Sequence, residues 1–391
     1  MINVALIGCG NWGLNYLRNL SELPSAKLVG CCDKRDGVLR QIKEHHPLIK
    51  VTNDFNEIAS NPKIDAVVVA TPPATHYQIA RTCLLRGKHV LVEKPFTLSP
   101  VDAEELVALS QKTGKVLMVG HILAYHPGIQ LIKEYIQSGE LGPVCYIRSI
   151  RTSLGLIRND VSVLWDKAPH DVAILLYLLG EEPTHVSAGG QAFMNPRLED
   201  MAFLSLRFQN NIIANIHVSW AEPRKASTTV IVGRNRMAVF DDVDSQEKVK
   251  IYNNGVENPN FASPVPIPVV RDSGDSLQDN KERVKNLVGG VEGGRDRMPA
   301  VTIPKIQASE PLRNQCLHFI ECIEEGKEPL TDGKNGLAVV RVLDRAEDSM
   351  RSNSEYLPLN GGYYDIASNQ RTNIVAKARS IWRGLRFERI F

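Results

Sequence analysis

The sequence lacks the features that would place the protein in a membrane, outside the cell or around a structural metal. No apolar run approaches the roughly 20 residues that a membrane-spanning helix needs. The first residues, MINVALIGCG, contain no basic segment followed by a cleavage site, so we expect no signal peptide. The seven cysteines are odd in number and include no C-x-x-C pair. This usage predicts reduced thiols, a cytoplasmic location and no metal site.

The sequence also lacks a strong excess of charge of either sign. The formal net charge is +2, which argues against a surface built to bind nucleic acid. The chain is 43% hydrophobic and 23% charged, which is ordinary for a globular protein. Its 391 residues are enough for two domains or one large one.

Short apolar strands alternate with helical segments through the first third of the chain. The expected strands are INVALIG, KLVGCCD, DAVVVAT, KHVLVEKP and KVLMVGH, and Gly87 and Gly114 close two of the helices between them. This alternation predicts a doubly wound parallel sheet. We assign residues 1–122 to this α/β domain.

A glycine motif joins the first strand to the first helix. Gly8, Gly10 and Gly13 have the spacing G-x-G-x-x-G. In this motif the first glycine permits a tight turn, the second lets the backbone approach a pyrophosphate, and the third allows close packing of helix on strand. The helix N-terminus then offers free N–H groups to the phosphates. Asn11 and Trp12 lie within the motif, where backbone and side chains meet the cofactor.

An acidic residue ends the second strand at the distance expected for a dinucleotide site. A carboxylate at Asp33 can accept hydrogen bonds from both ribose hydroxyls of an adenosine, which favours NAD. Lys34 and Arg35 follow directly, and cations at this place can hold a 2′-phosphate. NADP is therefore not excluded.

From about residue 125 the pattern changes to successive strands without helices between them. The segments THVSAGGQAF, MAFLSLRF, NIIANIHVSWA, STTVIVG, RMAVFDD and KVKIYNN are separated by turns such as QNN and GRN. They predict a large, mostly antiparallel sheet in an α+β domain for substrate binding and oligomerisation, residues 123–360. A loop rich in Gly and Pro is inserted near 255–300, and a basic amphipathic tail occupies 361–391.

The stretch LVEKPF places a lysine at the end of an apolar strand, where open α/β sheets bind their ligands. Together, VALIGCGNWG, VVVATPPATHYQIA, LVEKPFTLS, VLMVGHILAYHPG and LWDKAPHDVAILLYLLG resemble the Gfo/Idh/MocA oxidoreductase family. The resemblance covers roughly residues 1–250 and 305–357. It implies a Rossmann domain, a second domain with a large sheet, and a nicotinamide cofactor that takes a hydride from a sugar, an inositol or a related polyol.

The resemblance also implies catalytic residues. It places Lys94 beside the nicotinamide and the reacting hydroxyl, with a peptide to Pro95 that is often cis in the family. Asp166 and His170, in WDKAPHD, match the second catalytic region. We expect His170 to be the general base, because an imidazole titrates near neutral pH. Lys94 would donate a hydrogen bond to the reacting oxygen, and Asp166 would orient or polarise either Lys94 or His170. The roles of Lys94 and His170 can be exchanged. Because Pro169 favours a helix that starts near it, we expect Asp166 on the entry loop.

Further residues are expected around these two regions. The expected cofactor contacts are Gly8, Gly10, Asn11, Trp12, Gly13, Asp33, Lys34, Thr71, Pro72, His76, Glu93, Lys94 and His121. The expected substrate contacts are Lys94, Tyr125, Arg151, Arg158, Trp165, Asp166 and His170. The two arginines can meet a diphosphate because Arg binds phosphate bidentately, although each can equally pair with a surface acid.

Within the family, the stretch RTSLGLIRNDVSVLWDKAPHD is most similar to nucleotide-sugar members, UDP-N-acetylglucosamine 3-dehydrogenases in particular. This predicts oxidation of the 3-hydroxyl of a UDP-N-acetylhexosamine to a ketone that an aminotransferase can use. The alternatives are a keto-sugar reductase, an inositol or hexose-phosphate dehydrogenase, and a non-catalytic cofactor sensor. We expect the partners to be a small-molecule sugar and further copies of the chain, as a homodimer or homotetramer formed through the second sheet.

Overall fold

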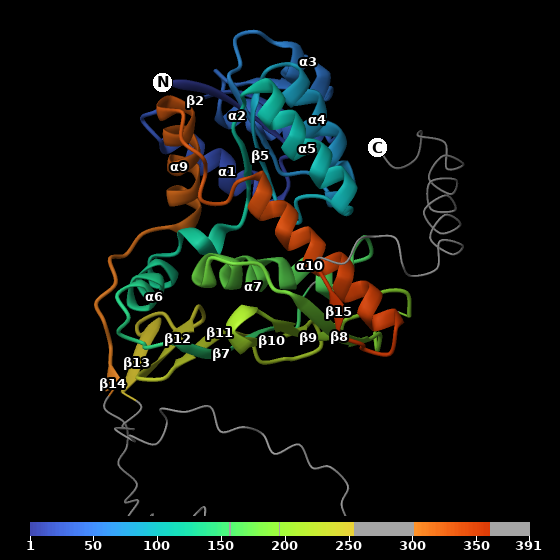
Figure 1. The fold of residues 1–391 in the computed structure, drawn as a ribbon. Coiled ribbons are helices and arrows are strands. Elements are labelled where there is room, and N and C mark those ends of the chain that lie inside the picture. Colours follow the sequence, from blue (N-terminus) through green and yellow to red (C-terminus); the bar gives the residue numbers. More distant parts are fainter. Residues whose placement is uncertain (156–157, 195, 254–300, 360–391) are drawn as a thin grey trace, which may run out of the picture.

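The computed structural model describes residues 1–391 except 156–157, 195, 254–300 and 360–391. The expected insert near 255–300 and the expected tail at 361–391 therefore lie outside the described residues. The rest of the chain forms two sheets, one above the other in Figure 1, with helices between and around them. No helix among the described residues is long and apolar enough to cross a membrane.

The first sheet has six parallel strands in the order β3-β2-β1-β4-β5-β6. Its strands are β1 Ile2–Ile7, β2 Ala26–Cys32, β3 Lys50–Thr52, β4 Ala66–Val69, β5 His89–Val92 and β6 Leu117–Val119. Its helices are α1 Asn11–Glu22, α2 Asp36–His45, α3 Phe55–Ser60, η1 Pro73–Thr75, α4 His76–Leu85 and α5 Pro100–Thr113. Helices pack on both faces, so every residue of β4 is fully buried, as the unbroken apolar strand sequences predicted.

The second sheet has nine strands in the order β14-β13-β12-β11-β7-β10-β9-β8-β15. They are β7 Val144–Thr152, β8 His185–Gln191, β9 Met201–Arg207, β10 Ile213–Ser219, β11 Ala226–Gly233, β12 Arg236–Asp241, β13 Val249–Asn253, β14 Val301–Thr302 and β15 Leu357–Pro358. The pairs are antiparallel except for β7 with β10, which run parallel. The expected Rossmann sheet and the mostly antiparallel second sheet are thus both confirmed.

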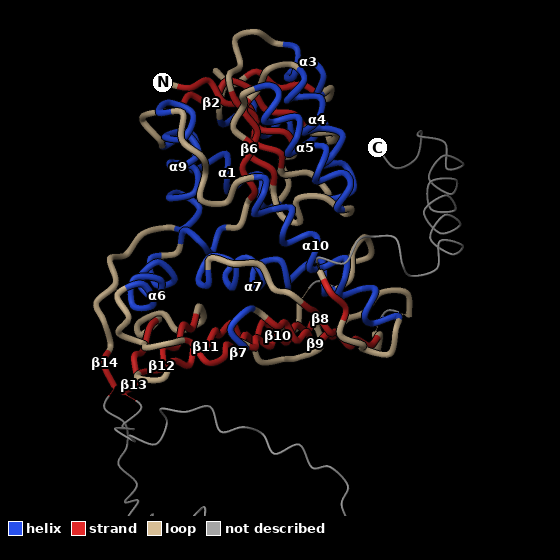
Figure 2. Tube along the Cα trace, viewed as in Figure 1, coloured by secondary structure: helices blue, strands red, loops and turns tan. Residues whose placement is uncertain are grey.

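One face of the second sheet is covered by helices that also reach the first sheet (Figures 1 and 2). The remaining helices are η2 Ile122–Tyr125, α6 Pro127–Gln137, α7 Val163–Leu179, η3 Gln209–Asn211, α9 Pro311–Glu325 and α10 Gly333–Arg351. Helix α7 lies across β7, β9 and β10, and α10 lies across β8 while also packing on α5 and β6. Helix α9 returns to the Rossmann side and packs on α1 and η2, which the sequence pattern did not predict. Helix α10 therefore joins the two sheets.

Helix α7 begins earlier than we expected. It starts at Val163, and Pro169 lies inside it. The backbone N–H of Asp166 donates to Ser162 O at 3.0 Å, so the first turn is already helical. A proline inside a helix removes one backbone bond, here to the carbonyl of Trp165, but this helix is buried along most of its length and packing offsets the loss. Asp166 is therefore a helical residue and not a loop residue.

Candidate active site

The carboxyl ends of the Rossmann strands face the first turns of α7. The strand order reverses between β1 and β4, and open α/β sheets bind ligands at such a reversal. The glycine turn follows β1, the Thr71–Pro72 turn follows β4, and Glu93-Lys94-Pro95 follows β5. His121 follows β6. Most of the sequence-predicted residues are therefore brought to one edge.

The glycine turn has the close contacts and the open space that a pyrophosphate needs. Gly8 has a φ of +93°, and a Cβ there would lie 2.5 Å from Ala70 O. A Cβ on Gly13 would lie 2.0 Å from Gly8 O, so strand and helix backbones meet at that point. Nothing lies within 4 Å of a Cβ built on Gly10, and no side chain caps the N-terminus of α1. The turn thus offers open space and free N–H groups, which fits the phosphates of a dinucleotide.

Asp33 lies beside this turn and is fixed by its neighbours. Its carboxylate accepts from the backbone N–H of Cys9 at 2.8 Å. It also accepts from the Arg35 backbone N–H, Nε and Nη2, each at 2.9 Å. Burial would raise the pKa of Asp33, but the bonds from Arg35 and Cys9 outweigh it and lower the pKa. The group is an ionised acceptor that fits a ribose, and the cation beside it is already paired.

The turn after β4 is tied to the turn after β5 through a buried histidine. His76 Nδ1 lies 2.9 Å from Pro95 O, and Nε2 lies 2.8 Å from Thr71 O. His76 thus holds the Thr71–Pro72 turn against the E-K-P turn. Of the other expected cofactor contacts, Asn11 and Trp12 are exposed at the start of α1, and Lys34 is exposed beside Asp33.

Lys94 meets Asp166 across the space between the two sheets. The peptide between Lys94 and Pro95 is cis. Lys94 Nζ donates to the Asp166 backbone oxygen at 2.7 Å and lies 3.3 Å from the Asp166 Oδ1. Only 10% of the Lys94 side chain and 19% of the Asp166 side chain are exposed, so water screens this pair weakly. An ammonium group has three protons, so one remains for a ligand.

Two further donors hold the Asp166 carboxylate. Arg158 Nη1 lies 3.3 Å from Oδ1, and Trp220 Nε1 donates to Oδ2 at 3.2 Å. Burial would raise the pKa of Asp166, but the charges of Lys94 and Arg158 and the bonds from Lys94 and Trp220 lower it overall. Asp166 is therefore an anion whose position is set by three donors. Arg158 also forms a paired contact with Asp160, at 2.6 Å, on the loop before α7.

Two histidines near Lys94 have ring nitrogens without partners. The buried atoms that make no hydrogen bond among the described residues include His170 Nδ1 and both ring nitrogens of His121. Burial, together with the charges of Lys94 and Arg151, lowers the pKa of His170 well below its usual value. Burial and Lys94 lower the pKa of His121 to about 3. Both rings are therefore neutral, and unpaired buried nitrogens are costly unless a ligand or water completes them.

Arg151 has a buried partner that the sequence did not indicate. Its Nε and Nη2 lie 2.8 and 3.1 Å from the two carboxylate oxygens of Asp171, and Nη1 donates to Ser227 Oγ at 2.9 Å. Asp171 is fully buried and also accepts from Ser149 Oγ at 2.7 Å. The guanidinium therefore anchors β7 and β11 to α7, and its fork is already engaged by a carboxylate.

Tyr125 and Trp165, which we expected near the substrate, are part of the core. The Tyr125 hydroxyl lies 3.0 Å from Thr331 Oγ1, and only 2% of the residue is exposed. The Trp165 indole donates to Glu347 Oε1 on α10 at 2.8 Å. Both polar atoms thus find protein partners, as buried Tyr and Trp usually do.

Two polar residues at this edge were missed from the sequence. Trp220 follows β10, and its bond to Asp166 comes from a strand that no motif marks. Lys167 donates to Ser153 Oγ at 2.8 Å and to Ser219 O at 2.7 Å, which ties the ends of β7 and β10 to α7. Burial lowers the pKa of Lys167 to about 8. Its place directly after Asp166 was the one available signal.

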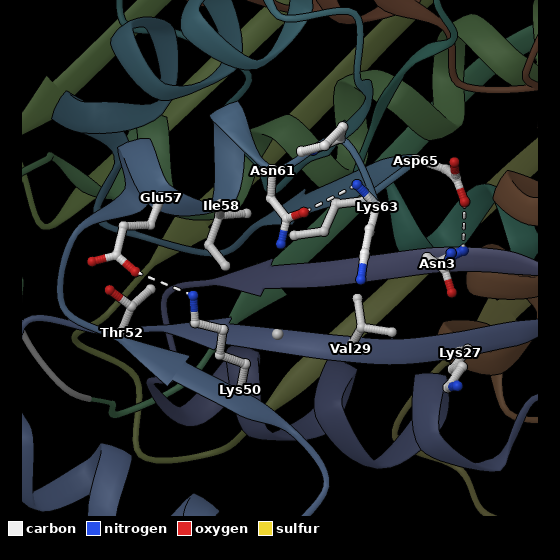
Figure 3. A pocket seen from close by; sticks show the side chains of 13 residues that line it. Asn3, Lys27, Val29, Lys50, Thr52, Glu57, Ile58, Asn61, Lys63 and Asp65 are labelled. Carbon is white, nitrogen blue, oxygen red and sulfur yellow. Dashed lines mark hydrogen bonds and ion pairs between the residues drawn. The ribbon is translucent and has the colours of Figure 1, made fainter.

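A hollow of about 480 Å³ lies elsewhere, at the amino ends of the Rossmann strands (Figure 3). It is lined by Lys27 on β2, Lys50 on β3 and Lys63 before β4, together with the apolar Val29 of β2 and Ile58 of α3. Because cofactors bind at the opposite edge of such sheets, this hollow is separate from the candidate site. Among the described residues, no group of three or more His, Cys, Asp or Glu side chains could hold a metal ion.

Comparison with known proteins agrees with this geometry. The model "Oxidoreductase family, NAD-binding Rossmann fold" of Gfo/Idh/MocA matches residues 2–121, and the C-terminal domain model of the same family matches residues 129–239. The scyllo-inositol 2-dehydrogenase (NAD(+)) of Bacillus subtilis is 30% identical over 233 residues, covering 57% of this chain and 68% of that protein.

Two nucleotide-sugar proteins are similar as well. The UDP-N-acetylglucosamine 3-dehydrogenase of Acidithiobacillus ferrooxidans is 33% identical over 217 residues, covering 55% of this chain and 65% of that protein. The structure of the WlbA dehydrogenase from Bordetella pertussis, in complex with NADH and UDP-GlcNAcA, aligns with a TM-score of 0.72 and 20% identity. The alignment covers 91% of this chain and 97% of that one. The family and the NAD cofactor expected from the motifs are confirmed: the chain belongs to the Gfo/Idh/MocA oxidoreductase family and is an NAD-dependent oxidoreductase.

Proposed function

We propose that the protein oxidises the 3-hydroxyl of a UDP-N-acetylhexosamine to a ketone, with His170 as the base and Lys94 as the group that holds the reacting oxygen. The observation that carries the proposal is the Lys94–Asp166 pair, which joins the turn after β5 to α7 near two neutral histidines. Such an arrangement supplies a cation for a developing alkoxide and a base for its proton.

Lys94 and Asp166 act on the reacting oxygen. Asp166 holds the ammonium group through its backbone oxygen and its carboxylate, so Lys94 Nζ has a defined position. The remaining ammonium proton donates to the substrate hydroxyl oxygen and stabilises negative charge as it develops there. The three donors around Asp166 keep it ionised, so it stays an acceptor throughout the reaction.

His170 removes the proton. Its ring is neutral, and its buried Nδ1 has no protein partner among the described residues, so the imidazole is free to accept the hydroxyl proton. Bound NAD supplies the hydride acceptor. The alcohol thereby loses a proton to His170 and a hydride to the cofactor, and a ketone remains.

The nucleotide-sugar assignment has two supports. Arg158, on the loop before α7, has a side chain that is 29% exposed, and its guanidinium is paired with Asp160 and Asp166. A diphosphate bound there would take the place of Asp160 on the guanidinium fork. The similar UDP-N-acetylglucosamine 3-dehydrogenase and the similar WlbA dehydrogenase, solved with UDP-GlcNAcA, carry such ligands by name. An inositol dehydrogenase is the second candidate, since the scyllo-inositol enzyme is 30% identical over a similar span.

A substrate panel separates these candidates. The purified protein is incubated with NAD, and separately with NADP, against UDP-N-acetylglucosamine, its uronic acid, inositols, free hexoses and hexose phosphates. Reduced cofactor is followed at 340 nm, with an aminotransferase and amino donor present to remove a 3-keto product. We expect turnover with the UDP-sugars and NAD, and loss of it in Lys94→Ala while NAD affinity stays nearly unchanged. Turnover confined to an inositol would overturn the nucleotide-sugar assignment, and normal turnover by Lys94→Ala would remove Lys94 from the mechanism.

We also propose that two copies associate through the uncovered face of the second sheet. Among the described residues, no helix covers this face. It presents Phe203, which is 52% exposed and stacks on His217 with ring centroids 4.3 Å apart, and Tyr146, which is 49% exposed. An exposed group of large apolar side chains on a flat sheet is typical of an interface.

A further inference from the structure

A buried chain of hydrogen bonds runs from α9, through α1, to the E-K-P turn. Gln315 Nε2 on α9 donates to the Tyr16 hydroxyl at 2.7 Å. The Tyr16 hydroxyl, on α1, donates to Glu93 Oε1 at 2.6 Å. The other carboxylate oxygen, Oε2, accepts from the Lys94 backbone N–H at 3.1 Å. The chain thus ends on the residue whose ammonium group meets Asp166.

None of these groups is placed to act on a substrate directly. Tyr16 and Gln315 are fully buried, and Glu93 is 7% exposed. Both oxygens of Glu93 have protein donors, and its own backbone N–H donates to Val69 O at 2.9 Å. A buried carboxylate without a cation against it is costly, and structures keep such groups only when their bonds are satisfied.

The backbone of Gly120 also lies against the Glu93 carboxylate. A Cβ on Gly120 would lie 2.8 Å from Glu93 Oε1 and 3.1 Å from the carboxyl carbon. The missing side chain at Gly120 therefore makes room for Glu93. Gly120 directly follows β6, and Glu93 directly follows the neighbouring strand β5. The backbone after β6 therefore limits the position of the carboxylate after β5.

We infer that Tyr16, Gln315 and Gly120 are positioning residues, which fix the Glu93 carboxylate and through it the backbone of Lys94 at the catalytic turn. The inference rests on the proposed role of Lys94. It also gives a reason for the return of α9 to the Rossmann side, because α9 contributes the donor that completes the Tyr16 hydroxyl. The helix that offers its N-terminus to the cofactor is the same helix that carries Tyr16.

The charge of Glu93 gives this arrangement a measurable signature. Burial raises the pKa of Glu93, and the bond from the Tyr16 hydroxyl opposes that rise. Loss of the hydroxyl should therefore raise this pKa further. The carboxyl group would then take up a proton at a higher pH, and the loss of turnover on the acid side should begin at a higher pH than in the unmodified protein.

The test compares matched Tyr→Phe variants in the full-length protein. Tyr16→Phe removes the hydroxyl that bonds Glu93. Tyr77→Phe removes a hydroxyl that bonds a glutamate too, Glu105, but on the outer surface of α4 and α5. We expect Tyr16→Phe to lower kcat about tenfold with NAD affinity changed less than about threefold, because misplacing a catalytic group by a fraction of an ångström costs this much. Tyr77→Phe should leave both quantities unchanged.

Three further measurements keep the result decisive. Gln315→Met keeps the side-chain shape but removes the donor to the Tyr16 hydroxyl. It should lower kcat by less than Tyr16→Phe does, and it serves as the test if Tyr16→Phe does not fold. Gly120→Ala should lower kcat because its methyl group would displace the Glu93 carboxylate. The additional loss of turnover at acid pH in Tyr16→Phe should vanish in the double variant Tyr16→Phe with Glu93→Gln, which has no carboxyl group to titrate at this position.

The outcomes distinguish this inference from the proposed function. If the unmodified protein turns over no substrate of the panel, the proposed function fails. If the unmodified protein is active and Tyr16→Phe, Gln315→Met and Gly120→Ala match it in kcat and pH profile, the positioning role is refuted. A loss of melting temperature in Tyr16→Phe without a change in kcat or pH profile would show a structural role only, and would also refute the inference.

Discussion

His170 offers a test of the site in which the structure determines both the magnitude and the pH dependence. The proposed base is neutral because burial and two nearby cations disfavour the imidazolium form. Replacing His170 by Asn removes the basic ring nitrogen while keeping a polar side chain of similar reach. General base catalysis contributes about 10²- to 10⁴-fold, so kcat should fall by that factor. NAD affinity should change little, since the glycine turn and Asp33 are untouched.

The pH profile follows from the direction of the shift. A base that is protonated loses activity as the pH falls through its pKa. With an ordinary pKa near 6.5, kcat/KM at pH 5.5 would be about tenfold below its plateau. Because the pKa of His170 lies well below its usual value, the imidazole is protonated only at lower pH, and the loss of kcat/KM at pH 5.5 should be clearly smaller than tenfold.

The assay is initial-rate production of reduced cofactor between pH 5 and pH 8.5, with whichever sugar the panel identifies. Affinity for NAD is measured by calorimetry in the same buffers as a control for folding and cofactor binding. A tenfold fall of kcat/KM by pH 5.5 in the unmodified protein, absent from His170→Asn, would show that the imidazole titrates normally. Turnover by His170→Asn within threefold of normal would refute its role as base.

Three other perturbations follow from the same structure. Asp33→Ser removes the proposed ribose acceptor and releases the Arg35 guanidinium, which Asp33 binds in the unmodified protein. The ratio of NAD affinity to NADP affinity, measured by calorimetry, should therefore fall at least about tenfold. An unchanged ratio would contradict this account of Asp33. The pKa of His121 is about 3 in the folded protein and near 6.5 in the unfolded chain, so its contribution to stability is present above pH 6.5 and is lost as the pH falls. Urea unfolding should therefore show that the free energy of unfolding falls between pH 7 and pH 5 by about 2 kcal/mol less in His121→Gln than in the unmodified protein. Equal decreases in the two proteins would contradict the lowered pKa. Phe203→Asp should lower the molar mass measured by light scattering, because it places a charge in the proposed sheet-to-sheet contact, whereas an unchanged oligomer would exclude that face.

The sequence was informative where a motif is local. The glycine turn, Asp33 and the E-K-P triplet each depend on residues within one strand and its following turn, so their spacing alone predicts their arrangement. The four-residue spacing of Asp166 and His170 places both on one face of α7 only because the helix begins at Val163, before the start that we expected near Pro169.

The sequence was less informative where the contact is made by distant strands. The acid opposite Arg151 is Asp171, on the helix that packs over its strand, and no spacing rule connects the two. Trp220 reaches Asp166 from the end of β10, which lies beside β7 only because those two strands pair in parallel. The start of α7 was misplaced because a proline normally marks the first turn of a helix, while here tertiary packing tolerates it inside the helix.

The division of the site between two sheets has a physical consequence. Lys94 belongs to the turn after β5 and Asp166 to α7, and each is mostly withdrawn from water. If the two halves separated, a nearly buried ammonium group and a nearly buried carboxylate would each lose a partner, which is costly at low exposure. The pair therefore favours the arrangement in which the halves face one another, and α10, which packs on β6 of the first sheet and on β8 of the second, acts in the same sense. The group that would hold the reacting oxygen is thus also a contact that fixes the geometry of the candidate site.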